Sequence, residues 1–283
     1  MRDPLNACLK LMRPINSAML GFAVIVGLAI VTGGIPGASY VVPSFLTGFF
    51  IGSSAMVLND IVDLEIDRVN APWRPLPAGK ISKRVALYCF AALSVLGLLS
   101  AYSTGVETLL VALIAWILAV LYDVKAKKMG LPGNAIVAFN VAVPLLYGAA
   151  LVGDLPPRIA AFWVMIFLSA LAREIAKGIA DVKGDSRAGV TTIAVTKGER
   201  VAALLSLLLY GAAVAVSPVP VMKGWVSPTA YLPLILVVDT LLIYSALRLL
   251  VRPEREVALW HKRVVLLAML LGLIGFYLGV STT

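Results

Sequence analysis

Two short stretches concentrate acidic side chains in a chain that otherwise has few of them. Together they hold seven of the 15 Asp and Glu residues, within positions 59–67 and 174–185. Carboxylates that lie close together repel one another unless a cation joins them. A hard divalent cation such as Mg²⁺ prefers oxygen ligands and keeps open positions for phosphate oxygens. The two stretches therefore predict a magnesium site that binds a phosphorylated compound.

The spacing within the first stretch places its polar groups on one helical face. Asn59, Asp63 and Asp67 recur every four residues, close to the repeat of about 3.6 residues in a helix. Asp60 falls at the edge of the same face. Glu65 falls on the opposite side, where we expect it to be solvated or paired elsewhere. One amide oxygen and three carboxylates are thus predicted to face the same way.

The second stretch has a similar pattern with fewer acids. Glu174 and Asp181 are seven residues apart, or about two helical turns, and Asp185 follows four residues later. Lys177 flanks this face. Gly184 is a signal for the end of a helix, so the direction of Asp185 is left open. The pattern predicts a second acidic face with a basic neighbour.

Two acidic faces at one site suit a reaction in which a diphosphate leaves. Metal ions held between them would bind the phosphate oxygens and neutralise the leaving group as a C–O bond breaks. Nearby Lys and Arg side chains would bind the remaining oxygens. The alternative is that the acids are solvated loop charges. The concentration of acids in a very apolar chain argues against it, because ionisable residues at membrane depth are costly and functional by default.

The composition shows what must position these side chains. The chain has 283 residues, 60% hydrophobic and 14% charged, with a mean hydropathy of +0.96. Soluble domains are about 45–50% apolar and about 25% charged. We therefore predict an all-α integral membrane protein with a single domain over residues 1–283. Nine segments are apolar and long enough to span a bilayer, with acidic loops on one side and a central cavity between them: 15–32, 40–58, 84–102, 107–122, 133–152, 157–176, 201–217, 228–250 and 263–280.

Charge placement supports this count of nine. All Lys and Arg residues except Arg158 and Lys223 lie in the N-terminal tail or beside the loops that follow even-numbered spans. By the positive-inside rule, the N-terminus and both acidic stretches are cytoplasmic and the C-terminus is outside, in a multi-pass protein of the cell membrane. The net charge of +9 follows from this topology. A nucleic-acid partner is therefore not needed, and no obligate protein partner is inferred.

The motifs resemble those of a known family. The first stretch reads Asn59-Asp60-x-x-Asp63-x-x-x-Asp67 and is followed by Asn70, Arg74-Pro75-Leu76-Pro77 and Gly79. It is similar to the signature of the UbiA family of intramembrane prenyltransferases, and Glu174 with Asp181 and Asp185 is similar to that family's second motif. Shorter matches lie at Arg13-Pro14-x-Asn16, Tyr122-x-x-Lys125-x-Lys127, Gly133-Asn134 and Gly189-Val190-Thr191-Thr192. Gly178 and Ala180 stand where members often have acids, so the second motif keeps fewer carboxylates.

The resemblance implies transfer of a prenyl group from an isoprenoid diphosphate to an acceptor within the bilayer, with Mg²⁺ as cofactor. It implies that the residues with a direct part in catalysis are Asp63, Asp67, Asp181 and Asp185. The implied metal ligands are Asn59, Asp60, Asp63, Asp67, Glu174, Asp181 and Asp185. The implied substrate-binding residues are Arg13, Asn16, Arg74, Tyr122, Lys125, Lys127 and Lys177. For the basic residues the alternative is ordinary topological charge, and for Tyr122 it is an interfacial anchor.

The identity of the acceptor is the open question. The segments around Arg13, Tyr122 and Arg173-Glu174-x-x-Lys177 resemble the archaeal branch of the family, which makes digeranylgeranylglyceryl phosphate. That resemblance implies transfer of a geranylgeranyl group to the hydroxyl of geranylgeranylglyceryl phosphate. The alternative is an aromatic acceptor such as 4-hydroxybenzoate. A cation transporter fits less well, because its carboxylates would lie near the midplane on broken helices.

Overall fold

Long helices make up nearly all of the structure, which is a computed structural model that describes residues 4–34 and 37–281. Within these residues nine helices are long and apolar enough to cross a membrane. They are α2 (Pro14–Thr32), α3 (Ala38–Val62), α5 (Lys83–Tyr102), α6 (Val106–Val124), α7 (Leu131–Val152), α8 (Pro157–Arg187), α10 (Glu199–Val216), α12 (Pro228–Val251) and α13 (Arg255–Ser281). Each contains one of the nine predicted spans almost completely, so the count and the all-α class are confirmed.

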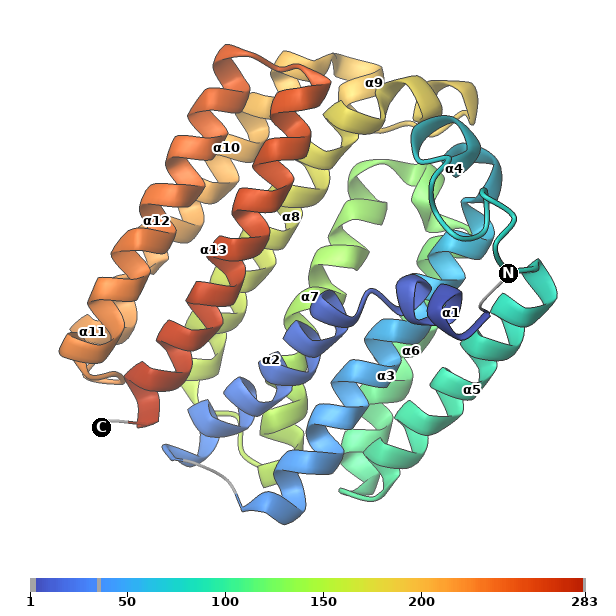
Figure 1. Cartoon of the computed structure of the whole chain (residues 1–283). Coiled ribbons are helices and arrows are strands. Elements are labelled where there is room, and N and C mark those ends of the chain that lie inside the picture. The colour runs from blue at the N-terminus through green and yellow to red at the C-terminus, as the bar shows by residue number, and fades with distance from the viewer. Residues whose placement is uncertain (1–3, 35–36, 282–283) are drawn as a thin grey trace.

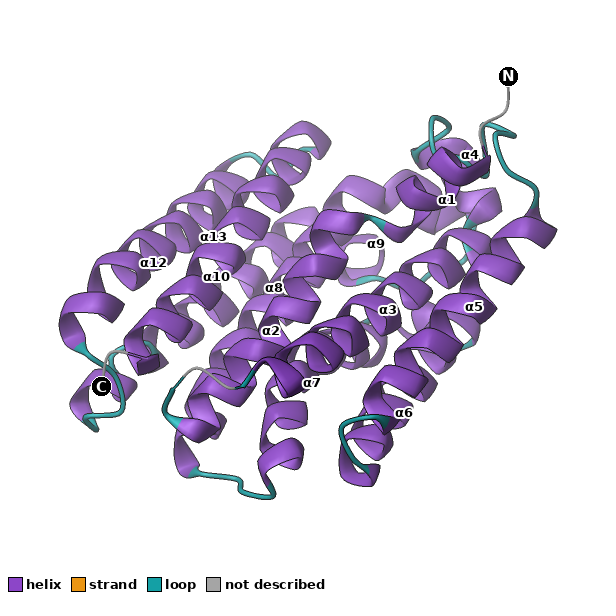
Figure 2. Cartoon of the chain, turned by 60° about the horizontal axis from the view of Figure 1, so that its bottom comes forward, coloured by secondary structure: helices purple, strands orange, loops and turns teal. Residues whose placement is uncertain are grey.

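Short helices join these spans. They are α1 (Pro4–Met12), α4 (Leu64–Asn70), the 3₁₀ helix η1 (Ala126–Met129), α9 (Ile193–Lys197) and α11 (Val219–Met222). Figure 1 shows α4 and α9 at the same end of the bundle, and α4 packs against α8. The view in Figure 2 shows the long helices running side by side, with loops confined to their ends. The end of the bundle that carries α4 therefore brings the two acidic stretches together.

Two helices extend beyond the predicted spans. Helix α8 continues from the apolar part through Gly184 to Arg187, and α13 begins at Arg255 rather than near 263. Hydropathy detects only the apolar part of a helix, so the polar turns beyond it were not predicted as span. Because Gly184 does not end α8, Asp185 stays on the same helix as Glu174 and Asp181.

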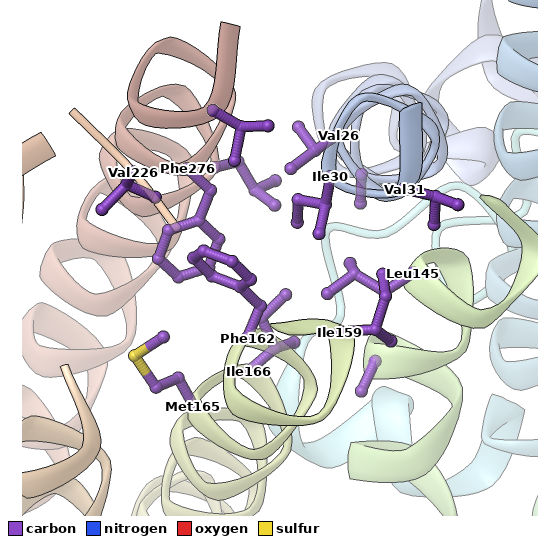
Figure 3. Packing of buried hydrophobic residues seen from close by; sticks show 14 of the residues in the cluster. Val26, Ile30, Val31, Leu145, Ile159, Phe162, Met165, Ile166, Val226 and Phe276 are labelled. Carbon is purple, nitrogen blue, oxygen red and sulfur yellow. The ribbon is translucent and has the colours of Figure 1, made fainter. Parts of the chain in front are cut away.

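The main core lies where α2, α7, α8 and α13 meet. Figure 3 shows Val26, Leu145, Phe162 and Phe276 pointing toward one another from these helices. The rings of Phe162 and Phe276 have centroids 4.7 Å apart. In a bilayer, moving an apolar side chain from lipid to a helix interface gains little hydrophobic free energy. Membrane helices are instead held together by close van der Waals packing of this kind.

Helices α2 and α7 approach most closely at two glycines. A Cβ atom on Gly148 would lie 2.3 Å from the backbone nitrogen of Leu28, and one on Gly27 would lie 2.6 Å from the Cα of Leu145. No side chain fits at such distances. The small residues around position 148 thus let α7 pack directly on the backbone of α2. Helix α2 in turn lines one side of the central cavity.

We predict that Gly148→Ala destabilises the protein by about 1–3 kcal/mol, because the added methyl group has no space. Gly211→Ala in α10 is the matched control, since no atom lies within 4 Å of a Cβ at that position. There the better helix propensity of Ala should leave stability unchanged or raise it. Thermal unfolding in one detergent would measure both variants. Equal melting temperatures for the two would contradict the close packing of α2 and α7.

Candidate functional site

The helices enclose a cavity of about 690 Å³ that is polar at one end and mainly apolar along the rest. Its polar end is lined by Asn59, Asp63 and Asp67, which we call the first wall, and by Glu174, Asp181 and Asp185, which we call the second wall. The apolar part is lined by side chains from α2, α3, α8, α12 and α13, among them Leu20, Ile51, Ile166, Ile235 and Phe276. A polar head group and an apolar tail can therefore share one cavity.

The first wall is formed where α3 passes into α4. Asp63 lies at the junction, yet its N–H still bonds to the carbonyl of Asn59 (2.8 Å), and the N–H of Asp67 bonds to the carbonyl of Asp63 (2.7 Å). The helical path is therefore nearly continuous, which keeps the predicted face intact. Asp63 and Asp67 are only 6% and 4% exposed. Glu65 points outward and pairs with Arg68 at 2.8 Å, as the spacing predicted.

Cations hold both carboxylates of the first wall. Lys127 forms an ion pair with Oδ2 of Asp63, and Nη1 of Arg74 lies 2.5 Å from Oδ2 of Asp67. Burial raises the pKa of the Asp67 carboxyl above its usual value, and the charge of Arg74 opposes this effect. Oδ1 of Asp63 is buried and has no hydrogen-bond partner among the described residues. A buried carboxylate oxygen in this situation is an acceptor for a cation.

The loop that carries Lys127 is held from the other side of the site. The hydroxyl of Thr191 donates to the carbonyl of Lys128 at 2.5 Å. Gly130 follows with a φ of 66°, and a Cβ at this residue would lie 2.4 Å from the carbonyl oxygen of Thr191. The segment after the second wall thus fixes the loop whose lysine serves the first wall.

Asp60 lies behind the first wall rather than on it. It is buried but does not line the cavity. Its Oδ1 forms an ion pair with Arg13 and lies 3.3 Å from Nη1 of Arg74. Asp60 therefore orients two arginines, and its expected role as a metal ligand is not supported by where it lies.

The second wall lies along α8. Glu174 is buried, forms an ion pair with Lys177, and has Nη1 of Arg173 at 3.4 Å. Asp185 is buried and Asp181 half-buried, and neither forms an ion pair within the described part of the chain. The second wall thus has one neutralised carboxylate and two that are available to a cation.

Most of the predicted substrate-binding residues line the cavity: Arg13, Asn16, Arg74, Tyr122, Lys127 and Lys177. Lys125 is the exception, because it is exposed and absent from the lining. Lys125 directly follows Val124, the last residue of α6. The chain then turns into η1, so Lys127 enters the site and Lys125 faces away.

Sequence reasoning missed several charged residues of the cavity, among them Asp123, Asp239, Arg255 and Lys262. Asp123 is buried, lines the cavity and accepts a hydrogen bond from the side chain of Asn59 at 2.8 Å. Its signal was a carboxylate at the end of an apolar span, directly after Tyr122. Lys262 also lines the cavity, because α13 begins earlier than predicted.

The arrangement fits a magnesium–diphosphate complex better than a site made of protein ligands alone. Among the described residues, no three acidic, Cys or His side chains gather closely enough to form a complete metal site. Magnesium is usually bound through one or two carboxylates together with substrate phosphates. The two walls offer such partial ligand sets on opposite sides of the cavity, and the buried Oδ1 of Asp63 fits this role.

Comparison with known proteins identifies the family of this chain. Residues 20–268 match the model of the UbiA prenyltransferase family, and the chain belongs to that family. The digeranylgeranylglyceryl phosphate synthase of Archaeoglobus fulgidus is 38% identical over 279 residues, covering 97% of this chain and 95% of the relative.

Solved structures show the same fold. A digeranylgeranylglyceryl phosphate synthase structure has a TM-score of 0.75 and 30% identity, covering 99% of this chain and all of that one. A UbiA homologue from Archaeoglobus fulgidus, solved with GPP and Mg²⁺, has a TM-score of 0.70 and 19% identity, covering 98% of this chain and all of that one. At this lower identity, the likeness shows the fold alone.

We predict that Asp123 positions Asn59. Asp123→Ala should lower kcat/KM for the prenyl donor by about 10- to 100-fold, the usual effect of losing a group that orients a metal ligand. Asp123→Asn keeps an acceptor oxygen and should lose less. Prenyl transfer measured at several Mg²⁺ concentrations would test this, and Asp123→Ala should need more Mg²⁺. Wild-type kinetics in that variant would show that Asp123 does not position Asn59.

Proposed function

We propose that this chain transfers a geranylgeranyl group from geranylgeranyl diphosphate to the hydroxyl of geranylgeranylglyceryl phosphate. The observation that carries the proposal is the pair of acidic walls across the polar end of a cavity whose remaining length is apolar. The relative that is 38% identical over nearly its whole length bears the name of the enzyme with this product. The cavity thus supports a diphosphate donor, and the name of the relative supports the lipid acceptor.

The donor diphosphate would lie between the two walls. Asn59, Asp63 and Asp67 on one side, with Asp181 and Asp185 on the other, would hold Mg²⁺. We leave Glu174 out of this set because both of its carboxylate oxygens lie beside cations, Arg173 at Oε1 and Lys177 at Oε2. Asp63 and Asp67 each pair with a cation through Oδ2 alone. When bound, Mg²⁺ would neutralise charge on the leaving diphosphate.

The basic residues have a role when the diphosphate binds. Lys127 and Arg74 form ion pairs with carboxylates that Mg²⁺ would also bind. A lysine or arginine that shares its carboxylate can turn toward a phosphate oxygen, which it binds with charge-assisted hydrogen bonds. Lys177, which pairs with Glu174 at the second wall, would bind a further phosphate oxygen. The donor tail would then extend along the apolar part of the cavity.

The reaction exchanges one C–O bond for another. The bond between the allylic carbon and the diphosphate oxygen breaks, and its electron pair leaves with the diphosphate. The acceptor hydroxyl oxygen forms a new ether bond to that carbon. Its proton passes to the departing diphosphate, so no histidine is required. His261 is buried and makes a contact with Tyr210 (3.2 Å) rather than lining the cavity.

The proposed orientation follows the charge pattern. The N-terminus and the end of the bundle with α4 and α9 would face the cytoplasm, and the C-terminus the outside. This would place the diphosphate site on the cytoplasmic side of the membrane. The apolar part of the cavity then lies at the depth of the bilayer.

A competition assay tests the acceptor. We predict that purified protein with Mg²⁺ and radiolabelled geranylgeranyl diphosphate prenylates geranylgeranylglyceryl phosphate at least about 100-fold faster than 4-hydroxybenzoate, both present at equal concentration. A preference of this size corresponds to about 2.7 kcal/mol of transition-state binding. Product that carries label mainly on the aromatic acceptor would replace the proposed acceptor. No transfer to either acceptor would overturn the proposed function.

A further inference from the structure

One arginine beside the first wall, Arg13, is not accounted for by the donor diphosphate. Arg13 and Arg74 both line the cavity and both pair with Asp60, which does not line it. The Asp60 carboxylate therefore pairs with both guanidinium groups from the side that faces away from the cavity. Arg74 also reaches Asp67, so it borders the diphosphate site, whereas Arg13 contacts no residue of either wall by a hydrogen bond or ion pair.

The backbone fixes Arg13 in an unusual position. It lies between α1 and α2 with a φ of 47°, and it is the only non-glycine among the described residues with positive φ. Such a conformation costs about 1 kcal/mol or more and is concentrated at functional sites. The hydroxyl of the buried Ser17 donates to the carbonyl of Met12 at 2.7 Å, and Ser53 donates to Ser17 at 2.9 Å. These hydrogen bonds fix the backbone between α1 and α2, and the ion pair with Asp60 fixes the guanidinium of Arg13.

Asn16 adds a neutral polar group beside Arg13. It lies one turn further along α2, is half-buried and lines the cavity. Its side chain has no hydrogen-bond partner in the described part of the chain. The two walls have their own cations, which are Lys127 and Arg74 on the first and Lys177 with Arg173 on the second. Arg13 and Asn16 are thus available for a second anionic group.

We infer that Arg13 and Asn16, with Arg74 at the border, bind the phosphate of the lipid acceptor. This inference rests on the proposed function and assigns a site within it. A guanidinium matches a phosphate with two parallel hydrogen bonds, and an amide donates a third. Asp60 keeps the two arginines together before the phosphate binds. The acceptor head group then lies beside the first wall, where its hydroxyl can reach the allylic carbon.

The test compares two acceptors that differ only in the phosphate: geranylgeranylglyceryl phosphate and geranylgeranylglycerol. The variant Arg13→Gln should raise KM for the phosphorylated acceptor by about 10- to 100-fold, the range for losing hydrogen bonds to a charged group. It should leave KM for geranylgeranyl diphosphate within about 2-fold of wild type. The preference for the phosphorylated acceptor should fall by the same factor.

Asn16→Asp gives an independent test, because it breaks no hydrogen bond within the described residues. The new carboxylate should repel the phosphate and impair use of the phosphorylated acceptor while sparing geranylgeranylglycerol. Arg68→Gln is the matched control, since Arg68 is a cation on the neighbouring α4 that is exposed and paired with Glu65. It should behave as wild type with both acceptors. Melting temperatures of all three variants would show whether each is folded.

The outcomes separate this inference from the proposed function. An increased KM for geranylgeranyl diphosphate in Arg13→Gln, with an unchanged preference between acceptors, would place Arg13 in the donor site and overturn the inference. Equal losses with both acceptors in Asn16→Asp would do the same. Wild-type protein that uses neither glycerol lipid would overturn the proposed function, and the inference with it.

Discussion

The structure depends on the pairing of buried carboxylates with cations from other segments of the chain. A buried carboxylate without a partner is strongly destabilising, and the pairing of two buried charges must offset the loss of water around both. Here Lys127 from η1 pairs with Asp63, and Arg74 from the loop after α4 pairs with Asp67. Each ion pair therefore joins two segments, and together the pairs fix the loops at one end of the bundle around the cavity.

The same pairs explain how the site can remain folded and still accept a metal–diphosphate complex. Each pair is nearly neutral, so the first wall is stable before substrate binds. A complex of Mg²⁺ and diphosphate brings both signs of charge. In the proposed function, Asp63 would pair with the metal ion instead of with Lys127, and Lys127 would pair with a phosphate oxygen. Both charged side chains would then keep a partner of opposite charge.

Much of this could be predicted from the sequence because the signals are local. Hydropathy predicted nine spans, and the four-residue spacing predicted the face shared by Asn59, Asp63 and Asp67. Helical spacing describes only one helix, however. It could not show that Asp60 is covered by Arg13 and Arg74, or that Asp123 from α6 meets Asn59. Those facts depend on how neighbouring helices pack, as does the different placement of Lys125 and Lys127.

If the two walls form one magnesium–diphosphate site, binding of the donor should depend on both of them. Radiolabelled geranylgeranyl diphosphate would be equilibrated with Asp63→Ala, Asp181→Ala and the exposed-residue control Glu65→Gln, with and without Mg²⁺. We expect Mg²⁺ to strengthen binding at least about 10-fold in wild type and in the control. Each wall variant should lose that gain while keeping its melting temperature within a few degrees. Wild-type affinity with Mg²⁺ in a folded Asp63→Ala or Asp181→Ala variant would show that the two walls do not form one magnesium–diphosphate site.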